Sequence, residues 1–355
     1  MNPFADATAP VRTGEELDRP GLEAFLRSKV PKLAGPIEIE QFPGGHSNLT
    51  YLVRSGDVEY VLRRPPYGAE VKSAHDMGRE VRVLSKLHEH FEPAPKPIAH
   101  CDDASILGAP FYLMERIPGV IYRAEPVEGF ELSPHRTRDA CYSFIETLAD
   151  LHALDYKEVG LQDLYRGPGY VQRQVDGWTR RWEGSKTEDL PEMDRIQEWL
   201  TKNLPADSGA SVIHNDFKFD NVVFSPEDMI TLVGVLDWEM ATVGDPLSDL
   251  AFTLTTWRQR SDGAANSRSA SFLCSSTGAL KRDELIRIYG RRTGRDMSDM
   301  LYHFVLALYK GIVIGQQIYY RYKTGKTNDP RFADFTRTVS GGTQRAIQVI
   351  ETGVM

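Results

Sequence analysis

The chain has 355 residues, of which 41% are apolar and 26% are charged. A chain of this length can bury two hydrophobic cores in one compact unit, and its charged residues predict a water-soluble protein. The net charge of −8 argues against non-specific binding to nucleic acid.

Three short β-type runs open the sequence and predict an antiparallel meander: 37–42, 49–54 and 58–63. The first turn of this meander contains Gly44 and Gly45. Glycines let backbone N–H groups approach a phosphate without a Cβ in the way, and Ser47 and Asn48 would add donors. The turn therefore predicts a phosphate-binding loop, although a Gly-Gly pair alone also fits an ordinary hairpin turn.

A helix is expected next at 74–90, followed by a buried strand at 111–117 that runs into a Pro-Gly break. This break is the expected hinge, so we expect two lobes, at 1–116 and 117–355. Beyond it, apolar residues recur with helical spacing in six segments: 134–154, 171–183, 193–203, 247–258, 282–293 and 302–322. The predicted fold class is α+β, with a small antiparallel sheet in the first lobe and a larger helical second lobe.

The most informative loop follows a short apolar run and contains Asp216, Lys218 and Asn221. Asp216 precedes Asn221 by five positions, which is the spacing of a kinase catalytic loop. Phosphoryl transfer needs a base, magnesium ligands and cations near the phosphates. Asp216 would accept the hydroxyl proton, and Lys218 would reach the γ-phosphate as a point charge. His214 would brace the loop.

A hairpin is expected beyond this loop, at 222–224 and 230–236, with Asp237 at its far end. Asn221 and Asp237 offer oxygen ligands, and proteins hold magnesium with one or two such groups together with substrate phosphates. Each piece alone is common, because Asn and Asp often cap their own turns. Together they predict a kinase whose Mg²⁺ arrives with the nucleotide.

Four segments together carry a family pattern: Gly-Gly-His-Ser-Asn-Leu-Thr-Tyr at 44–51, His-Asn-Asp-Phe-Lys-Phe-Asp-Asn at 214–221, Leu-Asp-Trp-Glu at 236–239 and Gly-Asp-Pro-Leu-Ser-Asp-Leu-Ala at 244–251. In these segments the chain resembles the aminoglycoside phosphotransferase and choline kinase family of the protein-kinase-like fold. Within that family it looks most like the kinase-like domains fused to, or encoded beside, acyl-CoA dehydrogenases. The resemblance implies a two-lobed kinase that uses ATP and Mg²⁺. It implies Asp216 as the base, Asn221 and Asp237 as magnesium ligands, and Asp249 as a support for the catalytic loop.

The resemblance also implies which residues bind the nucleotide. The third strand ends at Arg63, where the wider fold has a lysine that pairs with the phosphates, and arginine can grip phosphate bidentately. Glu80 on the following helix would be the partner of Arg63, although the neighbouring Arg64 leaves the register open by one residue. Three hinge residues would bind the nucleotide base through main-chain groups: Met114, Glu115 and Arg116. The choice between ATP and GTP stays open.

Only eleven residues separate Asp237 from Asp249, and a helix already begins at Pro246. A protein kinase has a long segment at this point, on which a peptide docks. The short connection therefore favours a small molecule with a hydroxyl group as the acceptor. One alternative is an aminoglycoside antibiotic kinase, and an alternative of another class is a pseudokinase that binds nucleotide without catalysis.

The segment 165–186 contains five basic and two acidic residues, with aromatic residues between them. In this family such a segment commonly helps to shape the acceptor site, and Trp257 and Arg258 add similar character. A basic, aromatic lining suits an anionic acceptor such as a hydroxyacyl-CoA, whereas an antibiotic polycation would favour carboxylates. The alternative is a surface helix with Trp178 and Trp182 packed inward and its arginines solvated.

The first residues, 1–6, lack the basic region and apolar core of a signal peptide. The three cysteines are scattered without the spacing of metal ligands and fit reduced thiols. The best candidate for a membrane span, 304–315, is too short and contains Lys310, so it predicts a core helix. We therefore expect a cytoplasmic protein without a nucleic-acid or membrane partner, and a homodimer stays open.

Overall fold

The computed structural model describes residues 4, 6–33, 35–43, 48–67, 76–126, 129–259, 262, 270–327 and 329–355. The chain divides into two compact units. Unit 1 consists of Met1–Ile121, Val159–Leu161 and Asn221–Ala241, and unit 2 consists of Tyr122–Glu158, Gln162–Asp220 and Thr242–Met355. The lobe boundary after residue 116 stays a prediction.

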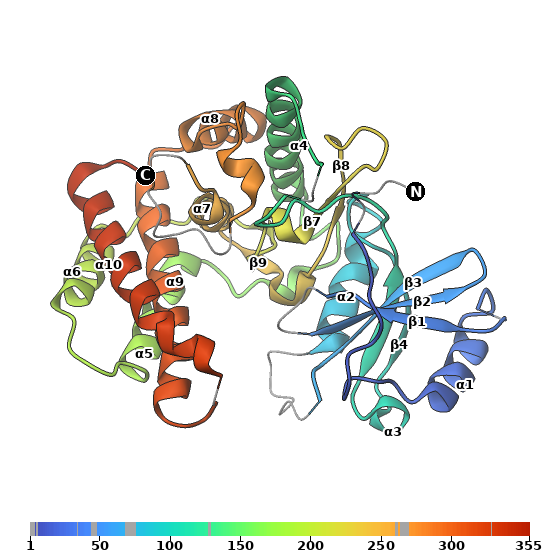
Figure 1. Ribbon diagram of the computed structural model, residues 1–355. Helices are drawn as coiled ribbons and strands as arrows, with labels where there is room; N and C mark the ends of the chain where they lie inside the picture. The colour runs from blue at the N-terminus through green and yellow to red at the C-terminus, as the bar shows by residue number, and fades with distance from the viewer. Residues whose placement is uncertain are drawn as a thin grey trace. The chain divides into compact units, whose positions relative to one another are not determined.

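Unit 1 is built on a five-stranded antiparallel sheet with the strand order β1-β2-β3-β5-β4 (Figure 1). Its strands are β1 (Glu38–Gln41), β2 (Leu49–Ser55), β3 (Val58–Arg64), β4 (Pro97–Cys101) and β5 (Phe111–Glu115). The described residues of this unit also form three helices: α1 (Arg19–Lys29), α2 (Met77–Leu87) and α3 (Ala104–Leu107). The expected meander is confirmed by β1, β2 and β3.

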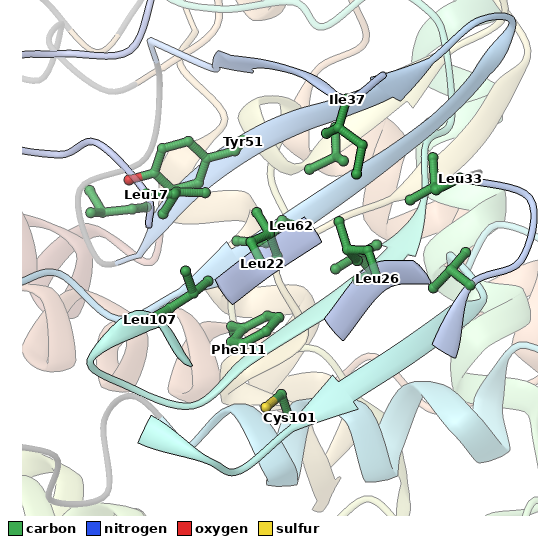
Figure 2. Packing of buried hydrophobic residues seen from close by; sticks show 14 residues of the cluster. Leu17, Leu22, Leu26, Leu33, Ile37, Tyr51, Leu62, Cys101, Leu107 and Phe111 are labelled. Carbon is green, nitrogen blue, oxygen red and sulfur yellow. The ribbon is translucent and has the colours of Figure 1, made fainter. Parts of the chain in front are cut away.

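Alternation of side chains along the strands gives the sheet two different faces. One face packs against α1 in a buried cluster that includes Leu22, Leu26, Tyr51, Leu62 and Phe111 (Figure 2). Arg63 and Tyr112 are the next residues along β3 and β5, so they point to the opposite face. There Arg63 meets Glu80 of α2. The two helices α1 and α2 therefore cover opposite faces of the sheet.

A hairpin of β7 (Val222–Phe224) and β8 (Leu232–Val235), followed by the 3-10 segment η3 (Trp238–Met240), completes unit 1. An isolated bridge joins Val120 to Phe224. A Cβ on the preceding Gly119 would lie 2.2 Å from the Phe224 carbonyl oxygen. The glycine of the Pro-Gly break is thus needed for a close approach to the hairpin.

Unit 2 is mostly helical. Its helices are α4 (Pro134–Ala153), α5 (Tyr170–Glu183), α6 (Pro191–Lys202), α7 (Pro246–Thr256), α8 (Arg282–Thr293), α9 (Met300–Lys323) and α10 (Phe335–Thr352). The strands β6 (Ser211–Ile213) and β9 (Thr242–Gly244) pair with each other. In its core, Phe144 of α4 stacks on Phe219 with ring centroids 4.5 Å apart, and it also contacts Phe217. This aromatic contact anchors the catalytic loop to α4.

The six helices expected in the second part of the chain are all present, and 282–293 matches α8 to the residue. The elements α1, β4 and α10 were not predicted. None of the helices in the described part of the chain combines the length and apolar character that crossing a membrane requires.

Candidate active site

Arg63 lies at the centre of an ion-pair network in unit 1. Its Nη1 donates to Glu80 Oε1 at 2.5 Å, and its Nη2 donates to Asp237 Oδ1 at 2.8 Å. The side chains of Arg63 and Glu80 are 7% and 1% exposed. Burial alone would lower the pKa of Arg63, but Glu80 and Asp237 outweigh burial and hold this pKa above its usual range. Arg63 is therefore a permanent cation beside Asp237, which suits the binding of a phosphate group.

Arg64 points away from this network. Its Nη1 donates to the Leu107 carbonyl oxygen at 2.8 Å, and its guanidinium lies 3.7 Å from the centre of the Tyr67 ring. Successive residues of a strand point to opposite faces of the sheet, so only Arg63 can reach α2. The register that the sequence left open is the one in which Arg63 pairs with Glu80.

Asn221 and Asp237 lie at the same end of the β7–β8 hairpin. Val222 pairs with Val235, and the Leu236 N–H donates to the Asn221 carbonyl oxygen at 2.8 Å. Asp237 follows with a φ of 67°, which is uncommon for a residue with a Cβ. An amide and a carboxylate on neighbouring backbone positions form an oxygen donor set that fits Mg²⁺. Their role as metal ligands stays a prediction.

Glu239, to which the sequence assigned no role, binds the end of the predicted phosphate loop. Asn48 Nδ2 donates to Glu239 Oε2 at 2.7 Å, and Arg79 Nη1 donates to the Glu239 carbonyl oxygen at 2.6 Å. Three members of that loop lie outside the described residues: Gly44, Gly45 and Ser47. Asn48 is thus the predicted loop residue that the structure places, and it is held by the Asp237–Glu239 segment.

The predicted hinge residues lie at the end of β5. Met114 is buried and Glu115 is exposed, and the Glu115 N–H donates to the Lys96 carbonyl oxygen at 2.8 Å. Arg116 forms an ion pair with Glu59. These contacts fix the strand end in unit 1, and the main-chain contacts to a nucleotide base stay a prediction.

Asp249 of α7 holds the catalytic loop in unit 2. It is fully buried, and its two carboxylate oxygens accept hydrogen bonds from the N–H groups of His214 and Asn215 at 2.7 and 2.8 Å. His152 Nε2 lies 3.1 Å from the same carboxylate, and His152 Nδ1 lies 2.7 Å from the Tyr289 hydroxyl. Burial alone would raise the pKa of Asp249, but the contacts with His152 and His214 lower it. Sequence reasoning missed this role of His152, and its signal was a polar side chain on the apolar face of a helix.

Asp216 and Lys218 lie on the loop that Asp249 holds. Lys218 Nζ is 3.0 Å from Asp216 Oδ2, and both side chains are partly exposed. The Asp216 N–H donates to His214 Nδ1 at 3.2 Å, and the buried His214 ring packs edge-on against Phe217. These contacts support the bracing role that the sequence predicts for His214. They leave a carboxylate beside an ammonium group, an arrangement that can accept a proton from a hydroxyl group.

The basic segment 165–186 forms α5 and the residues around it. Its five basic side chains are exposed, and Trp178 and Trp182 are buried in unit 2. This agrees with the alternative of a surface helix for those residues. Trp257 is also a core residue, because it packs on Phe144 and donates to the Leu280 carbonyl oxygen at 2.9 Å. The expectation that Trp257 contributes to an acceptor site is therefore wrong.

Comparison with known proteins adds independent information. A model described as the phosphotransferase enzyme family matches residues 38–285. Acyl-CoA dehydrogenase family member 11 from Rattus norvegicus is 37% identical over 329 residues, which cover 90% of this chain and 42% of that protein. The chain thus spans about two fifths of the length of the curated relatives it matches.

Two solved structures share the fold. A Ralstonia eutropha protein, provisionally named an aminoglycoside phosphotransferase, is 29% identical with a TM-score of 0.77, and the match covers 94% of this chain and 99% of that one. Aminoglycoside phosphotransferase APH(4)-Ia, in a ternary complex with AMP-PNP and hygromycin B, is 15% identical with a TM-score of 0.58, and the match covers 94% of this chain and 99% of that one. This second likeness concerns the fold alone.

The matches confirm the family and the kinase-like α+β fold that the sequence predicts. The matched range 38–285 includes the Arg63 network of unit 1 and the loop that carries Asp216 and Lys218 in unit 2. The chain belongs to the phosphotransferase enzyme family, and it is a kinase that acts on small molecules.

Proposed function

We propose that this kinase transfers the γ-phosphoryl group of Mg-ATP to a hydroxyl group of a small anionic molecule, with a hydroxyacyl-CoA as the acceptor type. One arrangement carries the proposal: Arg63 joins Glu80 to Asp237, and Asp237 lies at the end of the hairpin that begins beside Asn221. A cation and two oxygen ligands are the groups that kinases use to hold a Mg-nucleotide.

In this proposal unit 1 holds the nucleotide. Asn221 and Asp237 would hold Mg²⁺, which neutralises phosphate charge when it is bound. Arg63 would exchange its contact with Asp237 for a phosphate oxygen while Glu80 keeps the guanidinium in place. Asn48 would donate to the phosphates. The main chain of the three hinge residues would bind the base: Met114, Glu115 and Arg116.

Unit 2 would supply the base for the acceptor. The acceptor O–H bond breaks and its proton moves to the Asp216 carboxylate, while the hydroxyl oxygen bonds to the γ-phosphorus. The bond from the γ-phosphorus to the β,γ-bridging oxygen breaks, and ADP leaves. Lys218, 3.0 Å from Asp216, would stabilise the charge on the transferred group. Asp249 fixes the loop in advance, so that little positioning entropy is lost in the reaction.

ATP as the nucleotide is supported by the AMP-PNP in the ternary complex of the APH(4)-Ia structure, which shares this fold. A hydroxyacyl-CoA acceptor is supported by the name of the rat relative, an acyl-CoA dehydrogenase family member. The exposed arginines and lysine of 165–186 would attract the phosphates of coenzyme A. A polycationic antibiotic would be repelled by the same side chains.

A screen of ATP consumption tests the acceptor. The panel contains aminoglycosides, choline, sugars and hydroxyacyl-CoA esters, each assayed with ATP and with GTP. We expect turnover with at least one hydroxyacyl-CoA ester and ATP, and none with kanamycin. Strong turnover of kanamycin together with none of any acyl-CoA ester would contradict the proposed acceptor and favour an antibiotic kinase.

A further inference from the structure

Three helices of unit 2 and the catalytic loop line a small recess with a volume of about 20 Å³, which is partly open to solvent. The lining residues of α5, α7 and α9 are spaced by three or four positions, so each helix contributes one face. Four of them carry the argument: Trp178, Asn215, Phe252 and Lys310. Asn215 immediately precedes Asp216, so the recess adjoins the loop that carries the predicted base.

The Lys310 ammonium group lies among aromatic rings. Its Nζ is 4.6 Å from the centre of the Phe252 ring and 5.9 Å from the centre of the Trp178 ring. Within the described residues the structure gives Lys310 neither a hydrogen bond nor an ion pair. Burial lowers the pKa of Lys310, against the attraction of Asp249 and Asp216. The two rings stabilise a cation.

The carboxylates that act on Lys310 already have other partners. Asp249 accepts from the N–H groups of the catalytic loop and contacts His152. Asp216 lies 3.0 Å from Lys218 Nζ. A partly buried cation without an ion-pair partner is costly to the free protein, and such groups gather at functional sites.

We propose that this recess binds an anionic oxygen group of the acceptor, and that Lys310 is the specificity residue that recognises it. The inference rests on the proposed function and deepens it, because it names the part of the chain that recognises acceptor charge. Arg181 lies 4.3 Å over the Trp178 ring and adds positive charge to the same region. Because Asn215 connects the recess to Asp216, the anionic group that the recess binds belongs to the acceptor and not to the nucleotide.

Calorimetric titration with four probes tests this inference in the presence of saturating AMP-PNP and Mg²⁺. The probes are 3-hydroxybutyrate, its neutral amide, glycerol 3-phosphate and 3-hydroxybutyryl-CoA, which distinguish a carboxylate from a phosphate and a free acid from a thioester. The test variant is Lys310→Met, which keeps the unbranched stem and removes the charge. The matched control is Lys323→Met, because Lys323 is an exposed lysine at the end of the same helix, α9, and lies 5.9 Å from the centre of the Tyr319 ring.

The wild type should bind at least one anionic probe, and bind the amide more weakly than the acid. Lys310→Met should weaken binding of the anion by roughly 10- to 100-fold, the usual effect of losing a charged hydrogen bond, while Lys323→Met should change it by less than about threefold. The inference is wrong when no anionic probe binds the wild type, or when Lys310→Met binds the anions as the wild type does.

The proposed function and this inference can fail independently of each other. If the wild type binds AMP-PNP with Mg²⁺ but Lys310→Met binds the anionic probes equally well, the proposed function stands and this inference is wrong. If the wild type binds no nucleotide, the proposed function is wrong. The same titrations of the anionic probes without nucleotide would still decide the role of Lys310. A second readout needs no ligand, because removal of a partly buried charge that has no ion-pair partner should raise the unfolding midpoint of Lys310→Met. A clear fall of that midpoint would mean that Lys310 already has a stabilising partner and would contradict the inference.

Discussion

Replacement of Asp249 by asparagine tests how the catalytic loop is held. The wild-type carboxylate is fully buried and accepts from two backbone N–H groups at 2.7 and 2.8 Å, with His152 Nε2 at 3.1 Å. Asparagine keeps one acceptor oxygen and turns the other into a donor, so one loop N–H loses its partner and faces another N–H. A hydrogen bond to a charged group contributes about 1.5–3 kcal/mol, and a buried unpaired donor costs about 1–3 kcal/mol more.

We therefore expect Asp249→Asn to lower the free energy of unfolding by about 3–5 kcal/mol, a large share of the total for a domain. Turnover should fall by roughly 10²-fold, because the base is no longer held in position. Urea unfolding and steady-state kinetics measure the two effects. Asp245→Asn is the matched control, since Asp245 is equally buried but accepts from the N–H groups of Ser208 and Ser248. Asp245→Asn should cost stability with less loss of turnover.

The same substitution predicts a pH dependence. The folded pKa of Asp249 lies below its unfolded value, so its contribution to stability is present above the unfolded pKa of about 4 and is lost as the pH falls through the folded pKa. The stability difference between wild type and Asp249→Asn should shrink as the pH falls below about 4. A variant with full turnover and a loss of less than about 1 kcal/mol would refute the account of the loop.

Three further substitutions test other contacts. Asp216→Asn should cut turnover by about 10²-fold or more in steady-state assays while AMP-PNP affinity by calorimetry stays nearly unchanged, the usual effect of losing a general base. Arg63→Ala should raise the KM for ATP markedly, whereas Arg64→Ala should lower the unfolding midpoint, because Arg64 is buried and donates to the Leu107 carbonyl. Gly119→Ala should destabilise the protein in urea unfolding, because its Cβ would lie 2.2 Å from the Phe224 carbonyl oxygen.

Each of these has an outcome that contradicts it. Full activity of Asp216→Asn on the true acceptor would make Asp216 a structural residue. An ATP KM that rises in Arg64→Ala and not in Arg63→Ala would contradict the assignment of the two sheet faces. Unchanged stability of Gly119→Ala would mean that the segment after β5 can move away from the hairpin at little cost.

The sequence predicts the catalytic loop well because its information is local. The spacing from His214 to Asn221 and the position of Asp237 after a short hairpin need no knowledge of distant contacts. The choice between Arg63 and Arg64 is different, since both follow the same strand. It depends on which sheet face α2 covers, and that contact joins residues 17 positions apart in sequence.

Other features escaped the sequence for tertiary reasons. Gly341 and Gly342 weaken the helical pattern of α10, yet a Cβ on Gly342 would lie 2.8 Å from Ile312, so a glycine there permits close packing on α9. In α5, Trp178 and Trp182 are both buried, and Trp178 also lines the recess. The sequence placed Lys310 only in a core helix. It could not show the aromatic neighbours of Lys310, because these come from two other helices.

The central claim, that unit 1 holds a Mg-nucleotide through Asp237, is tested most directly by calorimetry with AMP-PNP. The account predicts binding by the wild type that requires Mg²⁺, and loss of this metal-dependent binding in Asp237→Ala. Glu38→Ala is a control, because Glu38 lies at the exposed start of β1 and its side chain is 72% exposed. No heat and no thermal shift of the wild type at millimolar AMP-PNP with Mg²⁺ would contradict the account, as would equal binding by Asp237→Ala.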